Sequence, residues 1–190
     1  MSPPPGGREF RVLSRRPIHG ARKYRCQEER VRFEDGREAA REVIRHPGAA
    51  VVLPFLPDGR IVLVEVFRHA AGGWMVECPA GTLEPGEAPG ACAARELEEE
   101  TGWRAASLRP LASWYPSPGL LDETMHLFRA EGLERSAVSP QEDEFVEPLS
   151  VTALEAASMV RDGRIRDGKT LLALFLGGVV AARPAAEGGP

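Results

Sequence analysis

The stretch "GTLEPGEAPGACAARELEEETGW", residues 81–103, crowds six glutamates between two glycines, Gly81 and Gly102. Most of its second half consists of good helix formers, and Gly102 stands where a helix commonly ends. The stretch therefore predicts a helix that begins near Ala88. Like charges that meet on a helix repel each other by about a few tenths of a kcal/mol per pair. We therefore expect a positive charge that offsets this repulsion.

Three of these carboxylates fall on one face of the predicted helix. Glu96 and Glu100 are four residues apart, and Glu99 is three residues from Glu96. Arg95 stands four residues before Glu99 and can pair with it. A hard divalent cation such as Mg²⁺ or Mn²⁺ prefers several oxygen ligands, which converging carboxylates provide. We therefore expect the metal to be the positive charge that offsets the repulsion. The alternative is a solvated acidic helix face, which is the usual interpretation of a charge run.

The composition is that of one ordinary globular domain. The 190 residues are 43% hydrophobic and 27% charged, a balance that suffices for a sizeable buried core. The net charge of −4 argues against a protein that holds nucleic acid by a general basic field. Cys26, Cys78 and Cys92 form no CxxC pair, so neither a disulfide framework nor a thiolate zinc site is predicted.

The cysteine content and the ends of the sequence favour a cytoplasmic protein. The first residues, "MSPPPGGREF", contain no apolar core of a signal peptide, and the run "LLALFLGGVVAA" (171–182) is shorter than a bilayer span. We therefore expect a soluble, intracellular protein whose partners include neither a membrane nor nucleic acid.

The chain is expected to have four parts. The proline- and glycine-rich ends, residues 1–7 and 183–190, are predicted to be disordered tails. Residues 8–46 are predicted to form an N-terminal arm of antiparallel strands, because residues 8–33 alternate between polar and apolar and "EDG" (34–36) offers a turn. Residues 47–182 are predicted to form the main domain.

The main domain contains a strong strand signal. Two runs rich in β-branched residues flank "PDG" (57–59), which predicts a hairpin turn near the centre of the sheet. Hydrophobic periodicity predicts the other elements. They are strands at 107–117, 123–133 and 147–151, and helices at 152–163 and 169–182.

The spacing in the opening stretch resembles the box of the Nudix hydrolases. With typical residue frequencies, chance agreement at all of its positions is on the order of one in a billion per starting residue. One departure is the final residue, a tryptophan where a smaller aliphatic residue is commoner. The matching positions are Gly81, Glu87, Arg95, Glu96, Leu97, Glu99, Glu100, Gly102 and Trp103.

Further segments are similar to ADP-ribose pyrophosphatases within that family, so the likeness runs from about residue 41 to residue 176. These segments are "VEVFRHAAG" (64–72), "ECPAGTLEPGE" (77–87), "YPSPGLLDE" (115–123) and "EDEFVEP" (142–148). The resemblance implies an α/β fold, a Nudix α/β/α sandwich with a mixed sheet and an N-terminal antiparallel strand arm. It also implies that the arm joins two copies of the chain in a homodimer and reaches across to complete the partner's adenine site.

The resemblance assigns a metal site to the helix. It implies that the backbone carbonyl of Ala80 and the side chains of Glu96, Glu99 and Glu100 bind Mg²⁺ or Mn²⁺. Arg95 can hold Glu99 in orientation, as outer-shell partners do around metal sites. We therefore count Arg95 and Glu99 among the catalytic candidates.

A general base is expected in a later loop. A pyrophosphate bond breaks when water attacks one phosphorus in line with the leaving phosphate oxygen, and a base assists by accepting a proton. The resemblance places a catalytic glutamate in "QEDEFVEP" (141–148), with Glu142 as the first choice and Glu144 as the second. The alternative is a merely solvated acidic loop.

Four residues are candidates for substrate contacts. Arg68 suits a phosphate clamp because a guanidinium offers a planar fork of donors, although a surface salt bridge is an equal alternative. Arg41 is a weaker candidate for the phosphates. The resemblance places Pro118, in a stiff turn, and Glu123, which follows it, near the substrate pocket.

The predicted reaction is the hydrolysis of ADP-ribose to AMP and ribose 5-phosphate. The nearest alternative substrate is another nucleoside diphosphate sugar, such as GDP-mannose. A non-catalytic Nudix-fold binding module is disfavoured because this box retains its ligands. The segment "RDGKT" (166–170) has only a superficial likeness to a phosphate-binding loop, and we predict no ATP site there.

Overall fold

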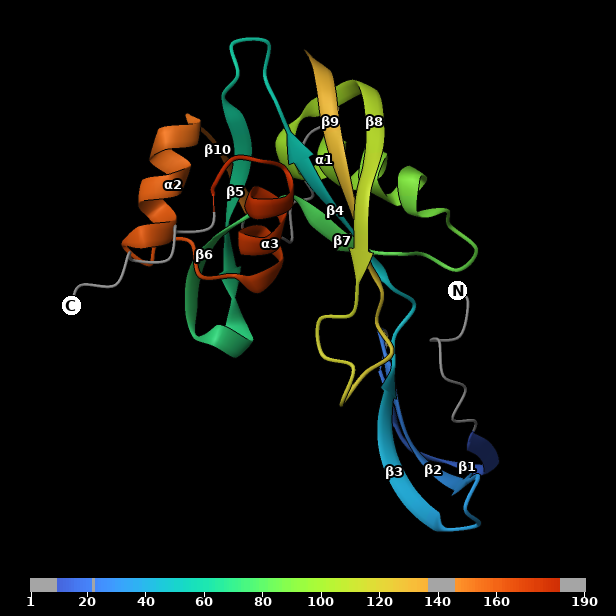
Figure 1. Cartoon of the computed structure of the whole chain (residues 1–190). Coiled ribbons are helices and arrows are strands. Elements are labelled where there is room, and N and C mark those ends of the chain that lie inside the picture. The colour runs from blue at the N-terminus through green and yellow to red at the C-terminus, as the bar shows by residue number, and fades with distance from the viewer. Residues whose placement is uncertain (1–9, 22, 137–145, 182–190) are drawn as a thin grey trace, which may run out of the picture. The chain divides into compact units, whose positions relative to one another are not determined.

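The structure is a computed structural model that describes residues 10–21, 23–136 and 146–181 (Figure 1). The chain divides into two compact units. The smaller unit comprises residues 1–47 and 117–123, and the larger unit comprises residues 48–116 and 124–190. Both predicted tails, residues 1–7 and 183–190, lie outside the described residues.

The smaller unit contains an antiparallel sheet in the order β1-β2-β3. Its strands are β1 (Phe10–Gly20), β2 (Arg25–Phe33) and β3 (Glu38–Arg45). Gly36 lies in the turn between β2 and β3 with a φ of 82°. The antiparallel arm predicted from the alternating residues is confirmed.

The segment 117–123 is bound to β3 within this unit. The backbone N–H of Ile44 donates to the carbonyl of Leu120 at 2.9 Å, and that of Asp122 donates to the carbonyl of Ile44 at 3.1 Å. Arg45 donates to the carboxylate of Asp122 at 2.9 Å and also pairs with the buried Glu29 of β2. The segment therefore folds with the arm, although about 70 residues of sequence separate it from β3.

The described part of the larger unit contains two sheets, in the orders β10-β5-β6 and β7-β4-β9-β8. Strands β4 and β9 run parallel, and the other neighbours run antiparallel, so the second sheet is mixed, as predicted. The strands are β4 (Ala49–Pro54), β5 (Ile61–Arg68), β6 (Gly73–Glu77), β7 (Ala80–Thr82), β8 (Trp103–Trp114), β9 (Met125–Arg135) and β10 (Val146–Val151).

The predicted turn between β4 and β5 forms, but the two strands then diverge into different sheets. Asp58 accepts a hydrogen bond from the backbone N–H of Arg60 at 3.1 Å, and Gly59 adopts a φ of 84°. One isolated bridge, between Phe55 and Ile61, joins the strands. Because each strand is a continuous apolar run, each occupies the interior of its own sheet with a neighbour on both edges.

Three α-helices lie in the described part of the larger unit, and their ends follow the sequence signals. They are α1 (Pro89–Thr101), α2 (Ala153–Arg161) and α3 (Gly168–Leu176), and a 3₁₀ turn η1 covers His69–Ala71. The helix predicted at 169–182 is shorter than expected, because Gly177 and Gly178 end it. None of the described helices is long and apolar enough to cross a membrane.

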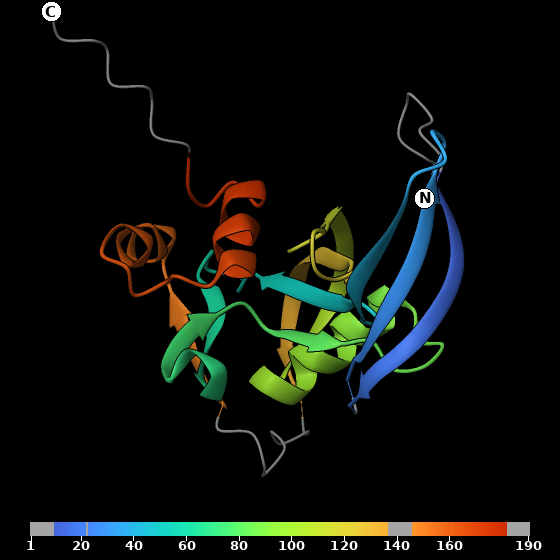
Figure 2. The same cartoon turned by 90° about the horizontal axis from the view of Figure 1, so that it is seen from below.

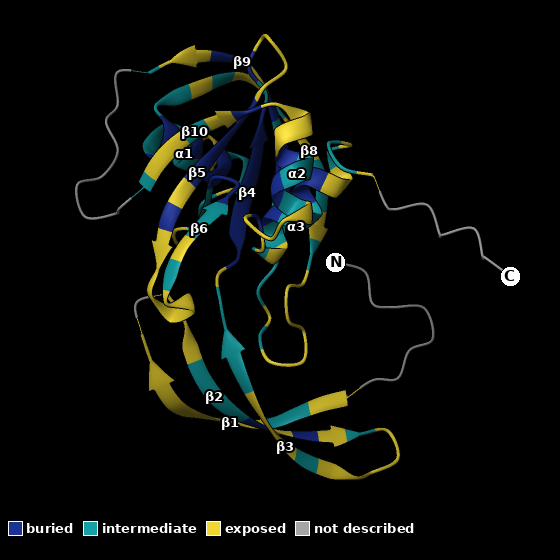
Figure 3. Cartoon of the chain, turned by 90° about the vertical axis from the view of Figure 1, so that its left-hand side faces the viewer, coloured by how far each residue is buried: buried dark blue, intermediate teal, exposed yellow. Residues whose placement is uncertain are grey.

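The larger unit has two apolar cores on opposite faces of β4, a strand that is buried along its whole length (Figure 3). Val51 and Leu53 belong to the core that α2 and α3 cover, whereas Ala50 and Val52 belong to the core that α1 covers. Figure 2 shows α1 on one side of these strands and α3 on the other. This arrangement confirms the predicted α/β/α sandwich.

Candidate active site

The buried side chains of helix α1 form a stripe along the helix, and its carboxylates lie beside this stripe. Cys92, Ala93 and Leu97 are fully buried in the core beside β4, and burying a leucine side chain contributes about 1.5–3 kcal/mol. The helix begins with Pro89 at its first position and ends at Gly102, which has a φ of 67°. This packing fixes which direction the glutamates of the same turns face.

Glu100 and Ala80 lie in direct contact. Glu100 is buried, with 7% of the residue's surface exposed, and its Oε2 accepts a hydrogen bond from the backbone N–H of Ala80 at 2.9 Å. Hydrogen bonds to an ionised carboxylate are among the stronger ones in proteins. The bond joins strand β7 to helix α1 at two of the positions predicted to bind metal.

Glu96 lies against the backbone of Gly81. A Cβ atom at position 81 would stand 1.8 Å from Oε1 of Glu96, a distance that no side chain permits. The first glycine of the box therefore leaves the space that the Glu96 carboxylate occupies. The sequence spacing indicated this glycine as a box position, but its contact with Glu96 was not predicted.

Arg95 lies at the centre of the acidic cluster. Its Nη1 donates to Glu96 at 2.7 Å and to Glu99 at 3.1 Å, and its Nε donates to Glu87 at 2.9 Å. The hydrogen bond from Arg95 lowers the pKa of Glu87 to about 2. Among the described residues, Arg95 offsets part of the repulsion for which the sequence predicted a metal, and its pairing with Glu99 is the i, i+4 contact expected from the spacing.

The donor set of α1 fits a hard divalent cation. In the described part of the chain, no three His, Cys, Asp or Glu side chains are grouped as a metal site, and Arg95 neutralises Glu96 and Glu99 instead. The three glutamates nevertheless present only carboxylate oxygens, from two adjacent helical turns, beside the buried contact between Glu100 and Ala80. Oxygen ligands of this type are those that Mg²⁺ and Mn²⁺ prefer.

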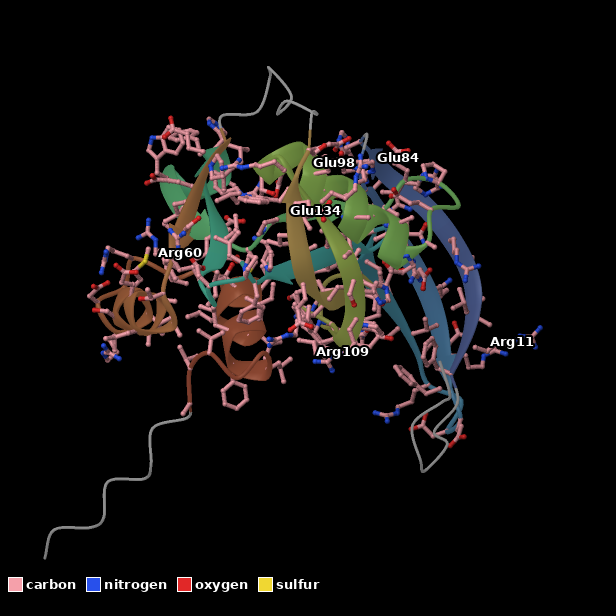
Figure 4. The ribbon with its side chains drawn as sticks, turned by 90° about the horizontal axis from the view of Figure 1, so that it is seen from above. Arg11, Arg60, Glu84, Glu98, Arg109 and Glu134 are labelled. Atoms are coloured by element: carbon pink, nitrogen blue, oxygen red, sulfur yellow. The ribbon has the colours of Figure 1, made fainter. Side chains whose placement is uncertain are left out.

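The other two glutamates of the opening stretch are Glu84 and Glu98. Figure 4 labels Glu84 in the loop before α1 and Glu98 on the helix. Glu98 pairs with Arg104 at 2.7 Å and also accepts a hydrogen bond from Ser136. Glu98 therefore serves as a matched control for the glutamates of the candidate site.

Arg68, the predicted phosphate clamp, pairs with a buried carboxylate. Its Nε and Nη2 donate to the two oxygens of Glu77 at 3.0 and 2.8 Å. Lys169 also contacts Glu77. Burial alone would raise the pKa of Glu77, but the hydrogen bond from Arg68 and the charge of Lys169 lower it overall. The sequence did not predict either partner, because Glu77 and Lys169 are 92 residues apart.

The remaining predicted substrate residues belong to the smaller unit. Arg41 is exposed on β3, with its guanidinium 6.0 Å from the centre of the Phe33 ring. Glu123 pairs with His46 at 3.3 Å, and Pro118 is exposed in the segment 117–123. Within the larger unit, by contrast, the structure brings the box residues and Ala80 together.

Both candidate bases, Glu142 and Glu144, lie outside the described residues. Strand β10 begins directly after them, at Val146, and pairs with β5. The assignment of the base therefore stays a prediction.

Comparison with known proteins decides the family. Residues 44–174 match the NUDIX domain family, and this match covers more than half of the chain. The chain belongs to the Nudix family. The box resemblance noted in the sequence is thereby confirmed.

Several known proteins are similar to this chain over most of their length. An ADP-ribose pyrophosphatase of Bacillus subtilis is 38% identical over 168 residues, which cover 87% of this chain and 91% of the relative. A methanol dehydrogenase activator of Bacillus methanolicus is 39% identical with the same coverage. A GDP-mannose pyrophosphatase of Yersinia enterocolitica is 37% identical over 139 residues, or 68% of this chain and 72% of the relative.

A solved structure supports the fold independently. The crystal structure of an ADP compounds hydrolase superposes with a TM-score of 0.77 over 90% of this chain and 92% of that chain, at 19% sequence identity. This likeness shows the Nudix fold.

Trp103, the unusual final residue of the Nudix box, contacts a cationic side chain. Trp103 begins β8 and packs against the core beneath α1. The guanidinium of Arg135 lies 4.2 Å from the centre of its ring, a favourable cation–π distance. The larger side chain is therefore packed against this core and contacts Arg135.

Proposed function

We propose that this Nudix protein hydrolyses the pyrophosphate bond of ADP-ribose to AMP and ribose 5-phosphate, with Mg²⁺ or Mn²⁺ as its cofactor. The observation that carries the proposal is the group formed by Ala80, Gly81 and the α1 glutamates, in which the strand backbone and the carboxylates are in contact. The similarity to an ADP-ribose pyrophosphatase over 87% of the chain supports the choice of substrate.

In this proposal Glu96, Glu99 and Glu100, together with the carbonyl of Ala80, would hold the metal. A bound divalent cation lowers the pKa of water and neutralises the charge that develops on the phosphates. The chain itself positions these ligands, because Glu100 is fixed by the backbone of Ala80 and Glu96 fits against Gly81.

Arg95 has a separate task in the proposed mechanism. It holds Glu87 with two of its nitrogens while it contacts Glu96 and Glu99 with the third. Its own position is therefore set by Glu87, outside the predicted ligand group. Arg95 orients the two carboxylates in the way that outer-shell residues orient metal ligands.

The chemical step is an in-line displacement at phosphorus. Water attacks one phosphorus, the bond from that phosphorus to the bridging oxygen breaks, and the bridging oxygen leaves with the other phosphate. The proton of the attacking water passes to a general base, for which Glu142 is the first candidate and Glu144 the second. Arg68 is the candidate for binding the diphosphate.

GDP-mannose is the alternative substrate, and the 37% identical Yersinia pyrophosphatase supports keeping it in view. A panel of ADP-ribose, GDP-mannose and ATP, assayed for nucleotide release with Mg²⁺ and with Mn²⁺, distinguishes the candidates. ADP-ribose is expected to exceed the other two in kcat/KM by at least about tenfold, which corresponds to about 1.4 kcal/mol of transition-state discrimination. A preference for GDP-mannose would overturn the substrate assignment but would leave the reaction class intact.

We also propose that the chain forms a homodimer through its N-terminal sheet. Strand β1 is an edge strand of the described sheet, and Phe10, Ile18 and Tyr24 are exposed on β1 and beside it. Exposed edges with apolar side chains favour association with another chain.

A further inference from the structure

The segment "RDGKT" (166–170), which the sequence left without a function, begins helix α3 and binds the end of strand β6. Asp167 accepts hydrogen bonds from the backbone N–H of Thr170 at 3.0 Å and from its hydroxyl at 2.6 Å. The hydroxyl of Thr170 in turn accepts a hydrogen bond from the backbone N–H of Cys78 at 2.8 Å. Lys169 pairs with Asp167 at 3.0 Å and with Glu77.

These contacts assemble four charged side chains, one of which is a buried carboxylate. Glu77 is 2% exposed and is bound by both Arg68 and Lys169, and Lys169 also pairs with Asp167. Two carboxylates and two cations give the group no net charge. A buried carboxylate costs several kcal/mol unless it is paired and hydrogen-bonded, so each member of this group depends on the others.

The two cations, Lys169 and Arg68, differ in how far their side chains are exposed to solvent. The side chain of Lys169 is 11% exposed, whereas that of Arg68 is 44% exposed. Glu77 takes the Nε and Nη2 of Arg68, which fixes the plane of the guanidinium and leaves Nη1 outside this pair. Arg68 is therefore held in one orientation, in which its Nη1 does not donate to Glu77.

This group lies within electrostatic range of the candidate metal site. The hydrogen bond to Glu77 raises the pKa of Arg68 most strongly, and the charges of Glu100 and Asp167 also raise it. The chain connects the two sites as well, because Glu77 and Ala80 are separated by only Cys78 and Pro79. A charge lost from the group would thus change the potential beside the place where a diphosphate is proposed to bind.

We propose that Lys169 is a positioning residue for diphosphate binding, which acts by neutralising Glu77 so that Arg68 can offer its charge and its remaining donors to the substrate. The proposal rests on the proposed function only in that the substrate carries a diphosphate. Replacing Lys169 with a neutral residue leaves the group with one excess negative charge, so that Glu77 cancels the charge that Arg68 would otherwise offer to the substrate. Replacing Asp167 with Asn has the opposite effect, and Asn still caps the helix.

The test compares charge variants of the full chain. For Lys169→Met we expect KM for ADP-ribose to rise about tenfold while kcat stays within about threefold. The dissociation constant of α,β-methylene ADP-ribose, measured by calorimetry, should rise by a similar factor. Lys169→Arg should restore both values to within about twofold, and Asp167→Asn should not weaken binding.

Two controls separate charge positioning from a loss of folding stability. Thr170→Val removes the hydrogen bonds of the hydroxyl with Cys78 and Asp167 but no charge, so it should lower Tm while KM stays within about twofold. In an Arg68→Met background, Lys169→Met should add less than about twofold to KM, because its effect passes through Arg68. An equal loss in both backgrounds, or a fall in kcat with KM unchanged, would overturn the proposal.

The experiment still tests the proposal if the Lys169→Met variant does not fold. Asp167→Asn and Lys169→Arg keep the helix cap and the buried cation, and weaker binding in Asp167→Asn would reverse the expected sign and overturn the proposal. If the wild type prefers GDP-mannose, the same variants are measured with that substrate, since both substrates carry a diphosphate. In that case the substrate assignment fails while the role of Lys169 is still tested.

Discussion

At the scale of single residues, three glutamates of the candidate site are bound to the same arginine. Arg95 contacts Glu87, Glu96 and Glu99, whereas Glu100 is satisfied by the backbone of Ala80. Glu96 and Glu99 are therefore the carboxylates whose charges a metal would share with Arg95. Glu100 is already oriented by the strand.

The first prediction concerns these ligands. Glu96→Gln and Glu100→Gln should each lower turnover by more than about a hundredfold, because even changes behind the ligands of a metal site cost about 10–100-fold. Steady-state kinetics at saturating Mg²⁺, together with Mn²⁺ titration, would measure the loss. Glu98→Gln is the control on the same helix, because Glu98 pairs with Arg104 instead. Turnover of the two ligand variants within a few-fold of wild type would end the metal-helix hypothesis.

The second prediction concerns the general base. Glu142→Gln should lower kcat much more than it raises KM, since a base acts mainly in the transition state. Glu144→Gln is its control and should keep kcat within a few-fold. A large loss in Glu144→Gln with almost none in Glu142→Gln would shift the assignment by two residues.

The sequence predicted some of these residues and not others for a physical reason. The ligand face of α1 could be read from local spacing, because residues three and four apart meet on any helix. The alternative roles of Arg68 could not be resolved in that way. Its carboxylate partner lies on the next strand, and the lysine that shares this partner lies on α3. Only the fold brings these three charges together.

At the scale of elements, the site depends on how closely α1 and β7 approach each other. Gly81 on the strand leaves space for the carboxylate of Glu96 on the helix, and Ala80 binds Glu100 one turn further along. The two glycines that bound the opening stretch therefore differ in purpose. Gly102 ends the helix in a left-handed conformation, whereas Gly81 allows a side chain to approach the backbone.

The third prediction follows from this contact. Gly81→Ala should displace Glu96 and lower turnover by at least about tenfold, because misplacement of a catalytic group by about 1 Å can cost about a hundredfold. Thermal unfolding should change little, since the displaced atoms are the end of a flexible side chain. Gly90→Ala is the control, because its Cβ would stand an ordinary 3.8 Å from Phe128. Wild-type turnover in Gly81→Ala would show that the position of Glu96 does not matter.

Element types were more predictable than the partners of each strand. The alternating arm, the apolar runs of β4 and β5 and the limits of α1 follow from periodicity and capping residues. The turn at Asp58 and Gly59 was also correctly located. However, a turn does not determine how far two strands remain paired. Competition from β6, β7, β9 and β10 for the edges of β4 and β5 separates them after a single bridge.

At the scale of the whole molecule, two compact units share one chain, and the segment 117–123 leaves the larger unit to join the smaller one. The smaller unit is mainly a three-stranded sheet with exposed Phe10, Ile18 and Tyr24 on or beside its edge strand. A sheet this small is marginally stable without a surface to pack against. A second copy of the chain is the surface that we propose.

The fourth prediction tests this dimer. Removal of residues 1–33 should convert a dimer to a monomer in light scattering and should raise KM for ADP-ribose, because the proposed interface and the substrate site share the arm. Replacing Phe10 and Ile18 with Ser is a milder variant that keeps the strand in place. A wild-type chain that is monomeric and still hydrolyses ADP-ribose efficiently would contradict the shared interface.

The contact between α3 and β6 also has a consequence for biosynthesis. The segment 77–80, which precedes the box, is bound by Lys169 and Thr170, so it is complete only when residues about 92 positions later are present. On the ribosome, the Nudix box is translated well before these residues emerge. A nascent chain therefore carries all of its α1 carboxylates while about 70 further residues are added, before the segment beside them gains its partners. We therefore expect activity only after α3, the last of the described helices, has left the exit tunnel.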